Sequence, residues 1–155
     1  MKEIYLDQGA TSYPKAPGVS MAIADYIENI GVNMNRGSYG KAMDVGNMAI
    51  SLRERACKLF TFQDPSHVII TPGATIALNT LIMPLFQEGG HVIISPLEHN
   101  AVRRPLEILL QREENPISLS SFPYDLGLDG DFSPLEKQIR PDTKALIMLH
   151  ASNVS

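Results

Sequence analysis

The sequence predicts an α/β fold with a mainly parallel sheet flanked by helices. Short apolar runs alternate with stretches of helical periodicity, and Gly, Pro and Asp occupy the turns between them. The chain has 155 residues, of which 44% are hydrophobic and 19% charged, and this suits one domain with a core of its own. A disordered chain or a membrane-spanning protein would have a different composition, so neither is expected.

Two helices are predicted in the first part of the chain, after a short strand at Ile4–Leu6. The first helix starts near Pro17 and ends at Gly31, which stands where a C-terminal cap belongs. The second is a long helix beyond Gly40. Its apolar face consists of Ala42, Val45, Ala49, Leu52, Ala56 and Leu59. Cys57 lies beside that face and is predicted to be a buried thiol.

Strands and helices alternate through the rest of the chain. Helices are predicted after Gly73, between Ser95 and Leu110, and after the loop Tyr124–Asp131, where Ser133 caps and Pro134 takes the first helical position. The predicted strands are His67–Ile70, Val92–Ile94, Pro116–Phe122 and Ala145–Leu149.

Charge and cysteine content limit the function classes. With 13 Lys and Arg against 17 Asp and Glu, the net charge is −4, and the chain has no basic excess with which to bind nucleic acid. The single Cys57 allows neither an internal disulfide nor a cysteine metal cluster. No metal site is predicted. A reducing, cytoplasmic location is expected, and the N-terminus lacks the apolar run of a secretory signal.

The turn Gly73–Ala74–Thr75 is the first candidate site. It joins a predicted strand to a helix, and a helix N-terminus carries unpaired N–H groups and a dipole that favour a phosphate. Small residues allow close approach, and Thr75 adds a hydroxyl. The alternative is a tight connection in which Thr75 is only an N-cap.

Two further candidates follow strand ends. Glu98–His99–Asn100–Ala101 comes after one predicted strand, and His150–Ala151–Ser152–Asn153 after another. Ligands of parallel sheets bind beyond the carboxyl ends of the strands, so the three segments are expected to share a pocket. His99 could be catalytic or a satisfied structural residue. Asn153 could offer an amide to a ligand or be a turn residue.

These segments, together with Tyr5–Leu6–Asp7–Gln8–Gly9–Ala10–Thr11, resemble class V aminotransferases, and among them cysteine desulfurases most. The resemblance implies the N-terminal part of the large domain of the aspartate aminotransferase-like fold (fold type I), with pyridoxal 5′-phosphate as cofactor. It implies that Gly73, Ala74 and Thr75 bind the cofactor phosphate. It also implies that His99 stacks on the pyridine ring as a catalytic group and that Asn153 contacts the ring oxygen.

The resemblance further implies removal of sulfur from L-cysteine, a small amino acid, by a homodimer. Another class V aminotransferase, a selenocysteine lyase, or a non-catalytic binding or assembly module on the same scaffold are the alternatives. No lysine matches the family's Schiff-base lysine. The lysines are Lys2, Lys15, Lys41, Lys58, Lys137 and Lys144.

The chain is therefore expected to be the N-terminal portion of a longer enzyme and inactive by itself. Its missing C-terminal half, or a second chain, would supply the lysine and the nucleophilic cysteine. The predicted domain organisation is an arm at residues 1–15 and an incomplete cofactor-binding large domain at residues 16–155.

Overall fold

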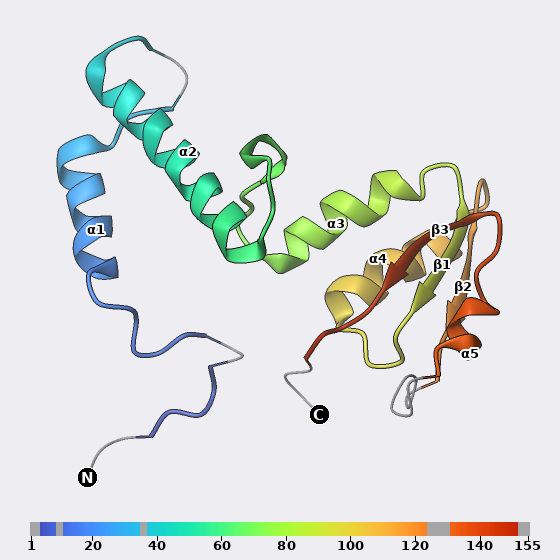
Figure 1. Cartoon of the computed structure of the whole chain (residues 1–155). Coiled ribbons are helices and arrows are strands. Elements are labelled where there is room, and N and C mark those ends of the chain that lie inside the picture. The colour runs from blue at the N-terminus through green and yellow to red at the C-terminus, as the bar shows by residue number, and fades with distance from the viewer. Residues whose placement is uncertain (1–3, 9–10, 35–36, 124–130, 152–155) are drawn as a thin grey trace. The chain divides into compact units, whose positions relative to one another are not determined.

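The structure is a computed structural model that describes residues 4–8, 11–34, 37–123 and 131–151. The chain divides into two compact units, Met1–Ile70 and Thr71–Ser155, which are described separately (Figure 1). The predicted boundary between an arm at residues 1–15 and a large domain at residues 16–155 is a different division of the chain, and it stays a prediction.

The first unit contains the two predicted helices. Helix α1 (Val19–Asp25) continues into the π-helical turn η1 (Tyr26–Ile30), which ends at Gly31 in the left-handed conformation, φ 47°. Only glycine adopts this conformation without strain, so the predicted C-terminal cap is confirmed. Helix α2 (Gly40–Phe60) follows. Of its predicted apolar face, Ala42 and Val45 are buried, as is Cys57, whereas Leu52 and Leu59 are exposed.

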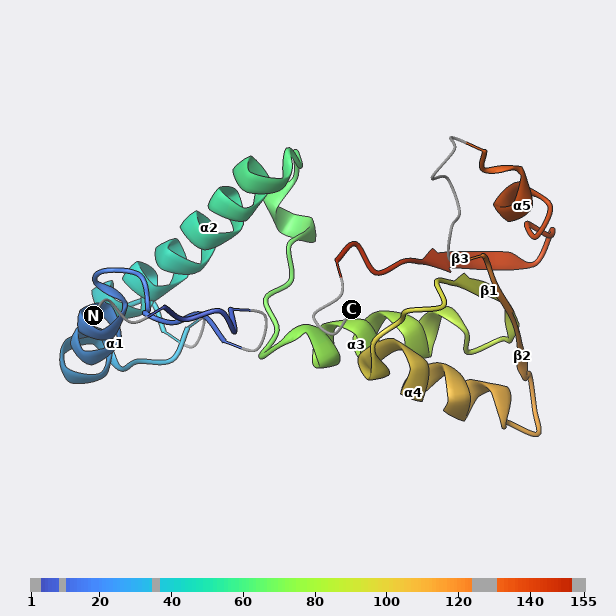
Figure 2. The same cartoon turned by 90° about the horizontal axis from the view of Figure 1, so that it is seen from below.

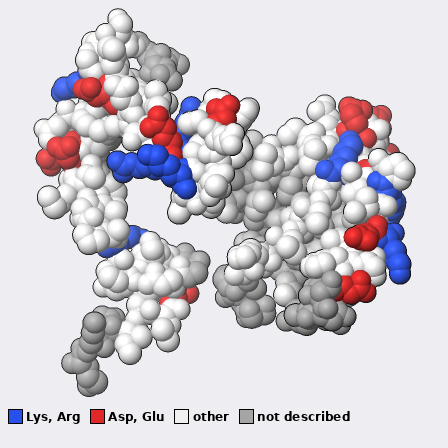
Figure 3. Space-filling model, in the orientation of Figure 1, with Lys and Arg blue, Asp and Glu red and all other residues white. Residues whose placement is uncertain are grey.

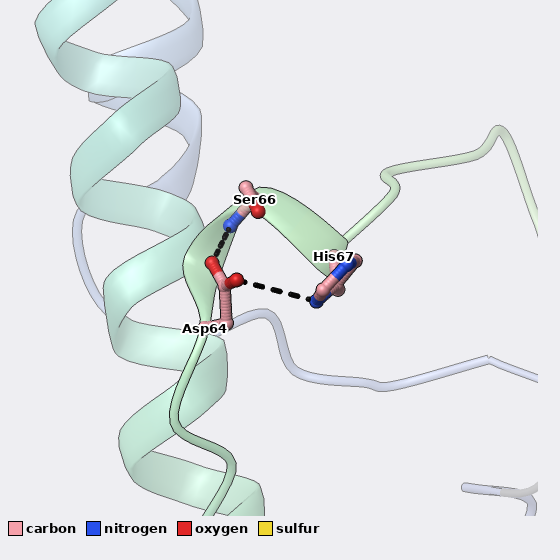
Figure 4. A network of polar contacts seen from close by, with 3 residues as sticks. All are labelled: Asp64, Ser66 and His67. Carbon is pink, nitrogen blue, oxygen red and sulfur yellow. Dashed lines mark hydrogen bonds and ion pairs between the residues drawn. The ribbon is translucent and has the colours of Figure 1, made fainter.

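Two of the predicted strands are wrong. Ile4–Leu6 has no regular structure, and the run His67–Ile70 is preceded and partly replaced by the 3₁₀ turn η2 (Pro65–His67). Asp64 starts this turn by accepting the N–H of Ser66 at 2.8 Å, and its carboxylate also lies 3.3 Å from His67 Nδ1 (Figure 4). Hydrogen bonds from Ser66 lower the pKa of Asp64.

The physical reason lies in strand pairing. An apolar run becomes a strand only when a neighbour accepts and donates its backbone hydrogen bonds. Residues 68–70 pair with no strand within the described ranges.

The second unit contains the predicted parallel sheet. Strand β1 (Gly90–Ile94) lies in the middle, with β2 (Ile117–Ser121) on one side and β3 (Thr143–Ile147) on the other, and both pairings are parallel. The last strand thus begins two residues before the predicted Ala145. Helices α3 (Ala74–Leu85) and α4 (Asn100–Leu110) agree with the sequence prediction.

Helix α5 (Ser133–Glu136) differs from its prediction at the N-terminus. Phe132 is the N-cap residue, and Ser133 is already helical. Asp131 accepts the Ser133 N–H at 2.8 Å and so takes over the capping role that the sequence assigned to Ser133. The predicted loop Tyr124–Asp131 lies outside the described residues except for Asp131.

The core lies between one face of the sheet and the helices α3 and α4. Alternate residues of β1, Val92 and Ile94, point into it because successive strand side chains face opposite sides. Figure 2 shows α3 and α4 on one side of the sheet and α5 on the other. The buried cluster consists of Ile82, Phe86, Val92, Ile94, Val102, Leu106, Leu109 and Ile117.

The turn between α3 and β1 depends on Gly89. Its φ is +64°, and an added Cβ would lie 3.0 Å from the Pro116 carbonyl oxygen and 3.2 Å from that of Asn115. We expect Gly89→Ala to lower the free energy of unfolding by about 1–3 kcal/mol, because left-handed backbone strains alanine and the contacts are tight. Urea unfolding followed by circular dichroism measures this loss.

Gly46 is the control for that substitution, since it lies inside α2 with open space around an added Cβ. Gly46→Ala is expected to raise stability by about 0.5–1 kcal/mol through helix propensity. An unchanged stability of Gly89→Ala would contradict the strain argument.

Candidate functional site

The N-terminus of α3 has the geometry of an anion site. Gly73 is the N-cap residue and offers no side-chain cap, so the first amides of the helix lack a side-chain acceptor. Thr71 shapes the turn by donating its hydroxyl to the Gly73 carbonyl oxygen at 3.1 Å. Ala74 and Thr75 are exposed. Because Gly73 is the N-cap residue, Thr75 is not, and it lies in the first turn of the helix.

His99 is the N-cap residue of α4. Its backbone is extended, and its ring Nδ1 accepts the N–H of Ala101 at 3.0 Å. A nitrogen that accepts from an N–H carries no proton, so the proton of the neutral ring is on Nε2. The structural role considered for His99 is thus present, and the exposed ring keeps Nε2 for a ligand.

Both helix N-termini lie at the same edge of the sheet. Helices that alternate with parallel strands run against them, and Figure 2 shows α3 and α4 beginning on the side where β3 ends. His150 and Ala151 continue from that edge. The structure thus brings Gly73, Ala74 and Thr75 to the same edge as His99, while Asn153 lies outside the described residues.

Glu98 is a buried carboxylate at this edge, and the sequence analysis gave it no role. It is 7% exposed. Its Oε1 accepts the hydroxyl of Ser95 and, at 2.7 Å, the backbone N–H of Leu149. The position of Glu98 directly before the N-cap of α4 was the only sequence signal for a structural role. The sequence did not indicate its second partner, Leu149, because that residue lies 51 positions away.

His91 is a second buried polar residue that sequence reasoning missed. It is fully buried in β1, with Nδ1 2.8 Å from Thr143 Oγ1 and Nε2 2.9 Å from Ser120 Oγ. Arg140 donates to the Ser120 hydroxyl at 3.2 Å. Burial lowers the pKa of His91, the charge of Arg140 lowers it further, and Asp142 opposes both.

The lowered pKa of His91 predicts a loss of stability in mild acid. The unfolded chain takes up a proton near the ordinary histidine pKa of about 6.5, while the folded chain resists it. Stability is therefore complete above that pH and falls by up to about 1.4 kcal/mol per pH unit below it, until the folded-state pKa is reached. Urea midpoints between about pH 7.5 and pH 5.5 measure the slope.

His91→Gln should flatten this slope. His67→Gln, at a side chain that is 73% exposed, is the control substitution that keeps His91 in place, so the slope should persist in it. Equal slopes in the wild-type chain and in His91→Gln would contradict the assignment.

Surface charge, membrane-spanning helices and metal-ligand clusters point to no further residues for this candidate site in the part of the chain that the structure describes. Acidic and basic side chains are interspersed on the visible face of each unit (Figure 3). Among the described residues, no helix is long and apolar enough to cross a membrane. Within the same ranges, His, Cys, Asp and Glu form no group of three that could hold a metal ion.

The comparison with protein families identifies the class of protein. The sequence matches the family "Aminotransferase class-V" over residues 4–155. The chain belongs to this family, and the resemblance seen in the sequence is confirmed.

Curated relatives show which members of the family this chain is similar to. A probable cysteine desulfurase of Chlamydia trachomatis serovar D is 30% identical over 155 residues, and one of Chlamydia muridarum is 28% identical. Each alignment covers 98% of this chain and 38% of the relative. The chain thus spans less than half of the length of the curated relatives it matches.

Solved structures confirm the fold. A "NIFS-LIKE PROTEIN" superposes with a TM-score of 0.80 at 20% identity and covers 98% of this chain and 41% of its own. A structure titled "SspA in complex with cysteine" gives 0.77 at 24% identity, with 93% and 41% covered. The parallel sheet with flanking helices is therefore the N-terminal part of a known fold.

Proposed function

We propose that this chain is the N-terminal portion of a pyridoxal phosphate-dependent enzyme of the cysteine desulfurase type, which removes sulfur from L-cysteine. The observation that carries the proposal is the open N-terminus of α3 at the same sheet edge as the His99 cap of α4. The names of the curated relatives support the desulfurase reaction over transamination.

The residues at this edge fit the cofactor. A phosphate needs several hydrogen-bond donors and a favourable dipole, and the uncapped first turn of α3 offers both. Gly73 has open space where a Cβ would lie, and the exposed Thr75 adds a hydroxyl donor. When bound, pyridoxal phosphate supplies an electron sink for cleaving bonds at the amino-acid substrate.

The remaining roles belong to side chains of this chain. His99 would stack on the pyridine ring, and Nε2 is the nitrogen at which it would hold or exchange a proton, since Nδ1 is bound to the Ala101 N–H. Asn153 would contact the ring oxygen with its amide, as the family resemblance implies. The lysine and the nucleophilic cysteine come from the C-terminal half that the relatives have, or from a second chain.

We further propose a cytoplasmic homodimer that acts on a small amino acid. The exposed apolar side chains of the first unit, such as Met21, Ile23 and Leu59, suit burial against further protein. Selenocysteine lyase and other class V aminotransferase activities stay alternatives within the family.

A binding experiment tests the phosphate site in the chain itself. Titration with pyridoxal phosphate, followed by NMR, should shift the amides of Ala74, Thr75 and Ile76 most. Thr75→Ala should weaken binding about 10- to 150-fold, the effect of losing one hydrogen bond to a charged group.

Thr80→Ala is the matched control. Its hydroxyl is bound to the Ile76 carbonyl oxygen at 2.8 Å on the same helix, so affinity should stay within about twofold of wild type, as for a surface change. Equal effects of the two substitutions would contradict the proposed phosphate site. A second test is sulfide release from cysteine by the product of the whole reading frame, since a binding module would release none.

A further inference from the structure

Glu98 extends the pairing of β1 and β3 beyond the last backbone hydrogen bond of the ladder. The Ser95 N–H still donates to the Ile147 carbonyl oxygen at 3.0 Å. The chain then turns away at Pro96. The next β3-side donor, the Leu149 N–H, is accepted by Glu98 Oε1 at 2.7 Å instead of by a backbone carbonyl.

The same carboxylate oxygen accepts a second donor, the Ser95 hydroxyl. Hydrogen bonds to an ionised acceptor are stronger than neutral ones, and a buried carboxylate without partners would be costly. Glu98, at 7% exposure, is therefore held tightly on both sides.

This arrangement has a consequence for the next residue. His99 caps α4 only while the turn 95–99 keeps its path, because the ring Nδ1 must reach the Ala101 N–H at 3.0 Å. The carboxylate binds that turn to Leu149, which directly follows β3 and lies 51 residues later in the sequence. Loss of the tie would free the turn, and the ring would then exchange between its two neutral tautomers.

We propose that Glu98 is a positioning residue for His99: its buried carboxylate locks the β1–α4 turn to the end of β3 and thereby keeps Nε2 as the protonated nitrogen of the His99 ring. The catalytic meaning of this lock rests on the proposed function. The lock itself does not, because it is a property of the chain without any ligand.

The proposed lock requires that the Glu98 side chain accept hydrogen bonds. Glu98→Gln keeps an oxygen at the position of Oε1 and removes the charge, whereas Glu98→Ala removes the acceptor. The control is Glu107→Ala. Glu107 is an exposed glutamate on α4 that accepts from Gln111 at 3.0 Å.

The experiment measures two quantities in the chain without cofactor: hydrogen exchange of the Leu149 amide and the ¹⁵N shifts of the His99 ring. Glu98→Ala should speed Leu149 exchange at least about tenfold, the equivalent of losing about 1.4 kcal/mol of protection, and move the ring shifts toward a tautomer mixture. Glu98→Gln should stay closer to wild type in both readouts. Glu107→Ala should match wild type.

Ser95→Ala keeps the test decisive where Glu98→Ala fails to fold, since it removes one donor and leaves the carboxylate. It should change both readouts less than Glu98→Ala and more than Glu107→Ala. Unchanged Leu149 exchange in Glu98→Ala would overturn the lock. Faster exchange with unchanged His99 shifts would overturn the positioning role and leave Glu98 merely structural.

A kinetic arm uses the product of the whole reading frame. Glu98→Ala should lower kcat at least tenfold with KM for cysteine within threefold, because the substrate is not bound by Glu98. A wild-type product without sulfide release would contradict the proposed function alone, since exchange and ring shifts are measured without it.

Discussion

Replacement of His99 by alanine is expected, under the proposed function, to lower turnover by about 10²–10⁴-fold, the usual contribution of a positioned acid or base. The proton at Nε2 is the one that the ring can exchange, since Nδ1 is bound to the Ala101 N–H. Sulfide release from cysteine, measured on the product of the whole reading frame, gives kcat and KM.

His99→Asn separates catalysis from helix capping. Asparagine is a good N-cap, so its side-chain oxygen can replace Nδ1 as acceptor for Ala101, but it has no ring. Stability should match wild type in His99→Asn and fall by about 0.5–2 kcal/mol in His99→Ala, while turnover is low in both. Near-normal turnover of His99→Asn would leave the histidine with a capping role only. His67→Ala, at an exposed site, is the control for loss of a histidine.

Phe86→Ala is expected to have the largest effect on stability, a loss of about 3–5 kcal/mol. Phe86 is fully buried at the C-terminal cap of α3 and belongs to the cluster that includes Leu106 and Leu109. Truncation removes apolar surface from the core and leaves a cavity that the sheet and α4 cannot fill. The free energy of unfolding from urea titration is the measurement.

Phe132→Ala is the control in the same unit, because its side chain is 53% exposed. Its stability should change by less than about 1 kcal/mol. A similar loss in the two variants would mean that burial in this cluster does not decide stability.

The elements that the sequence predicted correctly are those whose signal is local. The continuous apolar run Val92–Ile94 predicted β1, and the helical spacing of Val102, Leu106 and Leu109 predicted one face of α4. These local patterns require no knowledge of distant residues. The start of α3 after Gly73 was local in the same way, whereas the capping role of His99 was not among the predictions.

The features that the sequence did not predict depend on distant partners. The run His67–Ile70 is apolar but pairs with nothing in the described residues, so composition alone misled. Glu98 takes its role from Leu149, and His91 takes its role from Thr143 and Ser120, which belong to neighbouring strands. Buried polar residues of this kind are recognised only when the sheet order is known.

The sheet order β2-β1-β3 makes β1 a topological switch point. From β1 the chain passes through α4 to one neighbour, and from β2 it returns past β1, with α5 on the opposite face, to the other neighbour (Figure 2). The connections that leave β1 and β2 therefore pass over opposite faces of the sheet, and ligands of parallel sheets bind beyond the strand ends where the winding reverses in this way. Glu98 and Leu149 lie just beyond the ends of β1 and β3 and are joined there by a hydrogen bond. The winding of the chain would thus favour a ligand beside His99 even if both helix N-termini had other sequences.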